Sequence, residues 1–166
     1  MCSDLYIHPL GGEKETLKYV IINSLRVLFW SVCDFKVNQK IKFREGFRPF
    51  GASVLEEDVL LNFEGKLPIS PYMTITYQTK TEKIKFLQGV THADGTCRIQ
   101  TVNQAQNALF YQLLKHFKQK AGIGVCLNTS FNLNYEPIVC TPQQALATFY
   151  GSGLDVLIMG NYIIGS

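Results

Sequence analysis

The sequence predicts an α/β fold in which helices pack on a mixed sheet. Short runs rich in β-branched and aromatic residues recur along the chain, and two segments with helical spacing and clear end signals lie among them. No internal repeat, low-complexity stretch or long linker divides the chain. This order of strands and helices favours a mixed sheet with helices on its faces.

The composition is that of a globular protein with a sizeable core. Of 166 residues, 46% are hydrophobic and 17% are charged, which excludes a disordered chain. The net charge of +3 is small and the basic residues are dispersed, which disfavours nucleic-acid binding. Five cysteines without a CxxC pair argue against a disulfide framework and a zinc site. We therefore expect a cytoplasmic protein, with Cys126 and Cys140 as buried thiols.

The N-terminal region is predicted as a strand, a turn and a helix. Residues 1–13 are interpreted as the end of a strand with a Gly-Gly turn, and leucines, valines and isoleucines at helical spacing predict a helix from Glu15 to about Phe29. The apolar run Tyr19–Val32 is shorter than the roughly 20 residues that span a bilayer. It also contains Arg26, so we expect a buried helix and no membrane segment.

The segment KIKFREGFRPF, residues 40–50, alternates basic and apolar side chains. Read as a strand, it places Lys40, Lys42 and Arg44 on one face and Ile41 and Phe43 on the other. Such a basic face can simply be solvated. It can also bind phosphate, because arginine offers a bidentate fork and lysine a point charge.

The middle of the chain is predicted as strands, a reversal and a long helix. The strands are Tyr72–Thr79, Phe86–Val90 and Cys97–Val102, and Asp94-Gly95 is a strong reversal signal before the last of them. Asn103–Lys120 has a continuous apolar stripe, with Asn103 as the expected N-cap and Gly122 as the terminator.

Ile123–Leu127 is predicted as a buried strand that opens into the loop Asn128–Asn132, and Pro137–Cys140 as a further short strand. Thr141 and Gln144 fit a capping box, with Pro142 at the first helical position. This helix is expected to end near Gly151 or Gly153. Strands over Asp155–Met159 and Tyr162–Ile164 complete the predicted fold.

Two polar stretches are candidates for a binding site. THADGTCR, residues 91–98, contains Arg98 and is either a hairpin turn with an exposed arginine or an anion contact. NTSFN, residues 128–132, is either a simple hydrogen-bonded turn or a ligand loop at the carboxyl end of a strand. Ser130 lacks the sequence context of a hydrolase nucleophile. His92 has no partners at metal-ligand spacing and is predicted to be a hydrogen-bonded turn residue.

Six motifs in order resemble the C-terminal domain of the nodulation-protein/tobramycin-type O-carbamoyltransferases. They are KIKFREGFRPF, SPYM, THADGTCRIQTV, LNTSFN, EPIVCTPQQAL and GLDVLIMGNYII, and they cover roughly residues 38–164. The resemblance implies a YrdC-like fold over a twisted mixed sheet. It also implies that carbamoyl phosphate and ATP form a carbamoyl adenylate, from which a separate transferase domain carbamoylates a hydroxyl group in natural product biosynthesis.

The resemblance also implies particular ligand contacts. By motif position, Lys42 and Arg48 are expected to contact phosphate or nucleotide, and Arg98 another part of the anion. Asn128 and Ser130 are expected to bind the carbamoyl adenylate. ATP would bring Mg²⁺, although no carboxylate in this sequence is identifiable as its ligand, and no metal site is predicted.

The chain departs from the family pattern in four respects. Residues 1–36 resemble only a remnant of the end of the transferase domain, and residues 37–166 the C-terminal domain in a truncated form without its usual opening motif. Glu13 stands where the family has a metal-binding aspartate. Asn134-Tyr135 replace an Arg-Gly pair that usually precedes Glu-Pro.

These departures leave two functional hypotheses. In one, the chain is a component of a carbamoyltransferase that binds ATP and carbamoyl phosphate. In the other, it is a non-catalytic ligand-binding or protein-interaction module of the same family. Missing strands would expose apolar surface, so either hypothesis predicts a homodimer or a partner transferase chain. No nucleic-acid or membrane partner is expected.

Overall fold

The computed structural model describes residues 4–6, 19–22, 37–43, 45–65, 69–160 and 162–165. The chain forms two compact units. The first unit comprises Met1–Arg48 and Asn128–Ser166, and the second comprises Pro49–Leu127. The predicted domain boundary after residue 36 stays a prediction.

A mixed sheet forms the second unit. Its strands are β3 (Gly51–Leu55), β4 (Phe63–Glu64), β5 (Thr76–Thr79), β6 (Thr96–Val102) and the start of β7 (Val125–Thr129), in the order β7-β3-β6-β5-β4. β3 runs parallel to β6, with Ala52 opposite Ile99, whereas β5 is antiparallel to both β4 and β6. This arrangement confirms the predicted α/β fold with a mixed sheet.

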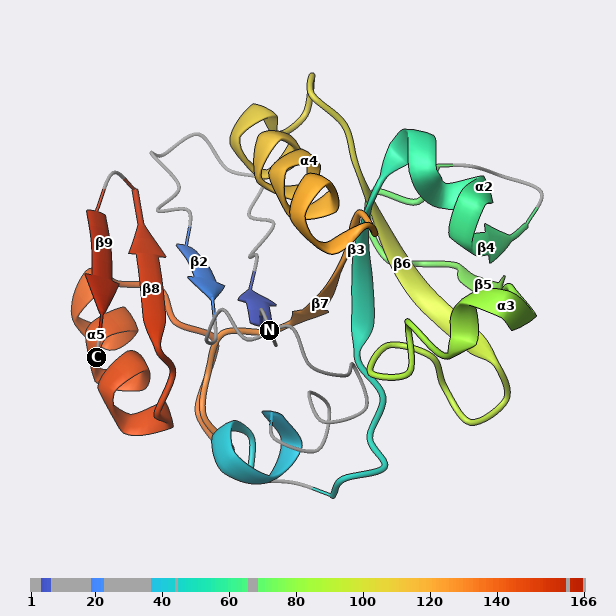
Figure 1. Cartoon of the computed structure of the whole chain (residues 1–166). Coiled ribbons are helices and arrows are strands. Elements are labelled where there is room, and N and C mark those ends of the chain that lie inside the picture. Colours follow the sequence, from blue (N-terminus) through green and yellow to red (C-terminus); the bar gives the residue numbers. More distant parts are fainter. Residues whose placement is uncertain are drawn as a thin grey trace. The chain divides into compact units, whose positions relative to one another are not determined.

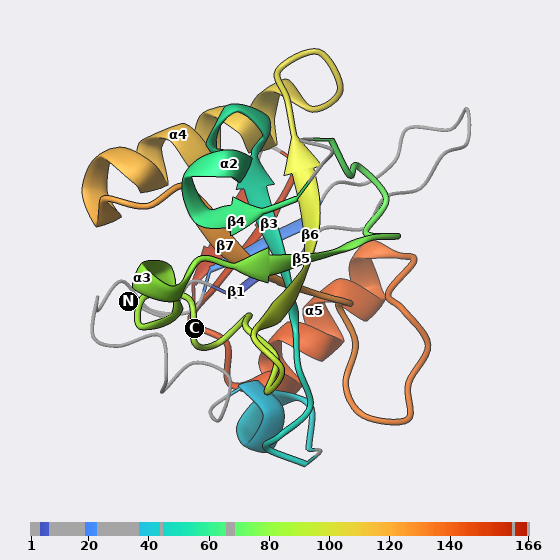
Figure 2. The ribbon, with the colours of Figure 1, turned by 90° about the vertical axis from the view of Figure 1, so that its right-hand side faces the viewer.

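Helix α4 (Ala108–Ala121) packs against β3 (Figure 2). It ends, as predicted, at Gly122, whose φ of 78° lies in the left-handed region. It begins later than predicted, because Asn107 is the N-cap and accepts a hydrogen bond from the Phe110 amide at 3.3 Å. Asn103 instead accepts from the Gln106 amide at 2.9 Å and so stabilises a separate turn.

Three consecutive acidic residues after β3 bind α4 and the turn before it. They form a 3-10 turn, Glu56–Asp58, followed by α2 (Val59–Asn62). Asn103 donates to Glu56 at 2.9 Å, and the Lys118 ammonium lies 2.7 Å from the buried Asp58 carboxylate. Tyr111 donates to Glu57 at 2.7 Å, and this hydrogen bond raises the pKa of the phenol. The three acidic side chains therefore connect the end of β3 to α4 and to the turn before it.

The predicted strand Phe86–Val90 is wrong. The segment follows the short helix α3 (Thr81–Ile84) and continues in tight turns, in which Lys83 O accepts from the amides of Phe86 and Leu87 at 2.9 and 3.1 Å. These local bonds occupy the backbone groups that a strand would offer to a neighbour. The strand predicted from Tyr72 begins only at Thr76.

The first unit contains an antiparallel sheet of β2 (Tyr19–Ile22), β8 (Val156–Met159) and β9 (Tyr162–Gly165), with α5 (Pro142–Ser152) beside β8 (Figure 1). β1 (Asp4–Tyr6) is a further strand in the described part of this unit. The predicted strands at the C-terminal end of the chain are confirmed.

The predicted helix over Glu15–Phe29 is contradicted where the structure describes it. Tyr19–Ile22 is a strand, and Tyr19 pairs with Met159. These four residues are β-branched or aromatic and suit a strand once a partner is present. The rest of the predicted helix and the Gly-Gly turn lie outside the described residues. No helix in the described part of the chain is long and apolar enough to cross a bilayer.

Helix α5 begins as predicted. Thr141 Oγ1 accepts from the Gln144 amide at 3.2 Å, and Gln144 Oε1 accepts from the Thr141 amide at 3.2 Å. Gly153, with φ of 65°, is its left-handed C-cap. The predicted strand Pro137–Cys140 is wrong, because this segment is irregular and Val139 donates a single bond to Phe131 O at 3.0 Å.

The cysteines differ in exposure. Cys97 and Cys126 are buried, whereas Cys140 is exposed, which corrects the prediction of a buried Cys140. Its segment lacks the strand on which that prediction rested. Burial raises the pKa of the Cys97 thiol to about 12.

Candidate functional site

The side chain of Lys42 reaches the loop at the end of β7. Its ammonium donates to Asn132 Oδ1 at 2.6 Å, to Asn132 O at 3.0 Å and to Ser130 Oγ at 3.3 Å, and it also bonds Ser130 O. Lys42 is only 4% exposed. We call Lys42, Ser130 and Asn132 the Lys42 cluster. It joins two segments of the first unit that are far apart in the sequence.

The segment around Lys42 is not the predicted strand with a basic face. Val37–Ile41 forms one π-helical turn, Lys42 is buried, and Phe43 is 59% exposed. Lys42 is therefore buried where the prediction had it on a solvated face. The hydrogen bonds of Lys42 explain this difference, since a buried ammonium needs several oxygen acceptors and the loop supplies them. Arg44 lies outside the described residues.

Ser130 and Asn132 are linked directly as well as through Lys42. Ser130 Oγ donates to Asn132 Oδ1 at 2.7 Å, and Asn132 Nδ2 donates to Glu136 O at 2.7 Å. Asn132 therefore holds the loop on both sides. Asn132 was not among the predicted ligand contacts. Its position two residues after Ser130 in NTSFN is the sequence feature that could have indicated its role.

The structure brings together Lys42 and Ser130 among the predicted contacts. Asn128 lies at the carboxyl end of β7, two positions before Ser130, and is 6% exposed. Ser130 itself is exposed. The loop thus presents a hydroxyl group at its surface, with a cation beneath it. Whether these residues bind a ligand stays a prediction.

Arg48 follows a turn in the first unit that is fixed by Asn38. The Asn38 side chain, which is buried, donates to Gly46 O at 3.2 Å and to Arg48 O at 3.0 Å. The Arg48 guanidinium is more than half exposed and lies 3.9 Å from Glu45. An exposed pair at this distance contributes little to stability. The guanidinium is therefore accessible, as a ligand contact would require.

Arg98 belongs to the second unit and is exposed on β6. Its cross-strand partner on β5 is Thr76, and the two share one face of the sheet because directly paired residues point the same way. On the same face, the buried Ser53 donates to Gln100 at 3.3 Å. Cys97 and Ile99 alternate with Arg98 and are buried. The arginine is thus on the polar face of β6.

The turn before β6 is the predicted Asp94-Gly95 reversal. Gly95 has φ of 80°, and Thr96 donates through its hydroxyl and its amide to Asp94 at 2.7 and 2.9 Å. The hydroxyl bond is the main cause of a lowered pKa of the Asp94 carboxyl. The His92 amide donates to Thr96 O at 2.7 Å, which confirms His92 as a hydrogen-bonded turn residue.

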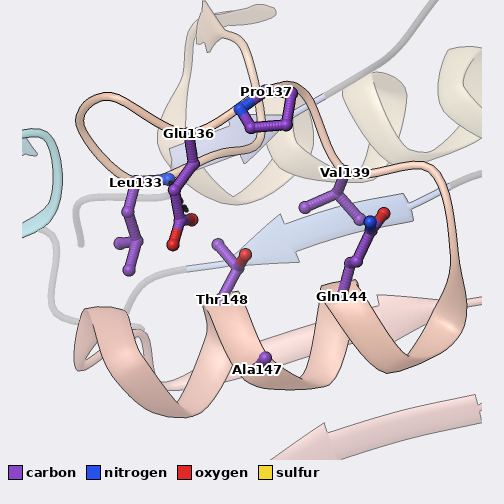
Figure 3. A pocket seen from close by; sticks show the side chains of 7 residues that line it. All are labelled: Leu133, Glu136, Pro137, Val139, Gln144, Ala147 and Thr148. Atoms are coloured by element: carbon purple, nitrogen blue, oxygen red, sulfur yellow. Dashed lines mark hydrogen bonds between the residues drawn. The ribbon is translucent and has the colours of Figure 1, made fainter.

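A pocket of about 260 Å³ lies between α5 and the loop that precedes it (Figure 3). Its lining comprises Leu133, Glu136, Pro137, Val139, Gln144, Ala147 and Thr148. Most of these residues are apolar, and the only charged one is Glu136, which would repel an anion. None of the predicted ligand contacts lines this pocket.

The described residues contain no group of three or more His, Cys, Asp or Glu that could hold a metal ion. Mg²⁺ in nucleotide sites is commonly held by substrate phosphates together with one or two carboxylates. The Lys42 cluster itself consists of an ammonium, a hydroxyl and an amide, which bond one another and the loop backbone.

The structure is thus that of an α/β protein in which the Lys42 ammonium binds a polar loop at the end of a strand. A family model described as "Carbamoyltransferase C-terminus" matches residues 31–166. The chain belongs to this carbamoyltransferase family, and its sequence is carbamoyltransferase-like over that range.

Three relatives illustrate the similarity. The chain is 42% identical over 133 residues to nodulation protein NolNO of Sinorhizobium fredii, with 78% of this chain and 19% of the relative covered. It is 38% identical over 133 residues to nodulation protein NolO of Bradyrhizobium diazoefficiens, covering 78% and 24%. It is 31% identical over 133 residues to 3'-hydroxymethylcephem-O-carbamoyltransferase of Amycolatopsis lactamdurans, covering 80% and 25%. The chain thus matches a quarter or less of each of these relatives.

Proposed function

We propose that the chain binds ATP and carbamoyl phosphate and contributes to the formation of a carbamoyl adenylate. The observation that carries this proposal is the Lys42 cluster, in which a buried ammonium lies behind the loop and binds Ser130 and Asn132 of that loop. A cation close behind a hydroxyl group favours a phosphate or a carbamoyl oxygen at the surface.

The chemistry of the proposed step suits these groups. Water first cleaves carbamoyl phosphate to carbamate and inorganic phosphate. A carbamate oxygen then attacks the α-phosphate of ATP, and pyrophosphate leaves. Catalysis therefore requires the reactants to be positioned and their charge to be stabilised. Ser130 and Asn128 would orient the carbamoyl group, and Arg48 would bind phosphate. On the second unit, Arg98 is proposed as an anion contact in its own right. Mg²⁺ would arrive bound to the nucleotide phosphates.

Membership of the carbamoyltransferase family supports a role in carbamoyl transfer in general. The name of one relative, a 3'-hydroxymethylcephem-O-carbamoyltransferase, states the O-carbamoylation of a hydroxymethyl group. We propose that a hydroxyl-bearing small molecule is the eventual acceptor. We propose that the transfer itself uses a transferase domain.

Calorimetry with ATP and with carbamoyl phosphate tests the binding step. Ser130→Ala should weaken binding roughly 3- to 10-fold, because one neutral hydrogen bond contributes about 1 kcal/mol. Thr81→Ala, which removes an exposed hydroxyl group from α3 in the second unit, is the matched control. Failure of the wild-type chain to bind either ligand at millimolar concentration would refute the proposal.

Pyrophosphate release distinguishes an enzyme component from a binding module. Release that depends on carbamoyl phosphate is expected if the chain forms the adenylate. Binding without release, also in the presence of Mg²⁺, would identify the non-catalytic module instead.

A further inference from the structure

We propose that Tyr135 recognises the nucleobase of the bound nucleotide by stacking on it. This inference rests on the proposed function and assigns a role to a residue outside the predicted contacts. Tyr135 has φ of 63° and is 99% exposed. A bulky residue in the left-handed region costs conformational free energy, and a fully exposed ring recovers none of it by burial.

The strain of Tyr135 is therefore not explained by packing. Glycine is the residue that adopts this conformation without a steric penalty. A strained residue that persists without a packing reason motivates a functional hypothesis. The exposed phenol ring is the one group that glycine would lack, so the ring is the feature to which we assign a role.

The loop that carries Tyr135 is held in place on both sides. Asn134 Nδ2 donates to Phe43 O at 3.0 Å, and the Glu136 amide donates to Leu133 O at 3.3 Å. Asn132 Nδ2 closes the same loop by donating to Glu136 O at 2.7 Å. The ring is thus displayed from a defined turn, which lowers the entropic cost of using it as a contact.

Tyr135 is also close enough to the Lys42 cluster to meet the same ligand. Tyr135 lies three positions after Asn132, and three positions of extended chain span at most about 11 Å. A nucleotide whose phosphates lie at Ser130 can place its base at that range. Stacking of a base on an aromatic side chain tolerates full solvent exposure before binding and needs no further polar group.

The test compares ATP with inorganic tripolyphosphate, which keeps the phosphates and lacks the base. Tyr135→Ala removes the ring and keeps a side chain in the strained conformation, Tyr135→Gly removes both ring and strain, and Tyr135→Phe keeps the ring. We expect Tyr135→Ala and Tyr135→Gly to weaken ATP binding roughly 5- to 100-fold and to leave tripolyphosphate binding unchanged. Tyr135→Phe should bind ATP like the wild-type chain.

The outcomes separate this inference from the proposed function. If the wild-type chain binds ATP and Tyr135→Ala binds it equally well, the stacking role is overturned and the proposed function stands. If both ligands weaken equally in Tyr135→Ala, the ring supports the loop rather than the base, which also overturns it. If the wild-type chain binds no ATP, both proposals fail. Thermal unfolding of each variant verifies that it is folded.

Discussion

The Nζ atom of Lys42 lies 2.6 Å from the Oδ1 atom of Asn132, ninety positions further along the chain. The same oxygen accepts the Ser130 hydroxyl at 2.7 Å. One amide oxygen therefore has two donors, and it fixes the position of the exposed hydroxyl group relative to the buried cation. This shared acceptor makes Asn132 a positioning residue of the loop and gives Lys42 a structural role alongside any contact with ligand.

Replacement of Lys42 by methionine should destabilise the chain by about 2–4 kcal/mol, because two carbonyl groups and an amide lose a charged donor. The free energy of unfolding in denaturant measures this change. Lys120→Met, at an exposed position near the end of α4, is the control and should change stability by less than about 0.5 kcal/mol. Equal effects of the two substitutions would show that the hydrogen bonds of Lys42 contribute no net stability.

Loss of the capping box should weaken α5. Thr141→Ala leaves the Gln144 amide without its acceptor and is expected to cost about 1 kcal/mol. For a chain of this size the midpoint of thermal unfolding should fall by roughly 2–4 °C. Thr141→Ser keeps the hydroxyl group and should behave like the wild-type chain. A serine variant as unstable as the alanine variant would exclude the cap as the cause.

Stability should fall in alkaline solution because of Cys97. Burial raises the pKa of this thiol from 9.0 to about 12 in the folded chain. Between these values the unfolded chain binds fewer protons than the folded chain, so the stabilisation is complete below pH 9 and is lost as the pH rises towards 12. Denaturant titrations across this range should show a steeper loss for the wild-type chain than for Cys97→Ala. Cys140→Ala, at an exposed thiol, should retain the wild-type slope.

The elements that could be predicted from sequence are those whose signals are local. Thr141, Pro142 and Gln144 define the start of α5 within four positions, and Gly95, Gly122 and Gly153 mark reversals that only glycine makes easily. These features were confirmed because the residues that specify each of them lie within a few positions of one another. Asn103 shows the limit of such signals, since it is a sound N-cap by type but caps a separate turn.

The elements that could not be predicted depend on partners far along the chain. Tyr19–Ile22 lies in a segment whose apolar residues have helical spacing, yet it forms a strand because it pairs with β8. The pairing joins residues near the two ends of the sequence, and spacing within one segment contains no information about it.

The sequence by itself determined the α/β class, the family and the chemical character of the polar stretches. The tertiary structure decided which of these polar groups meet. It placed Lys42 inside rather than on a solvated face, because the oxygens of Ser130 and Asn132 can satisfy a buried ammonium only once the loop at the end of β7 has folded against it. It also placed Tyr135 in a strained and exposed conformation that its residue type does not favour.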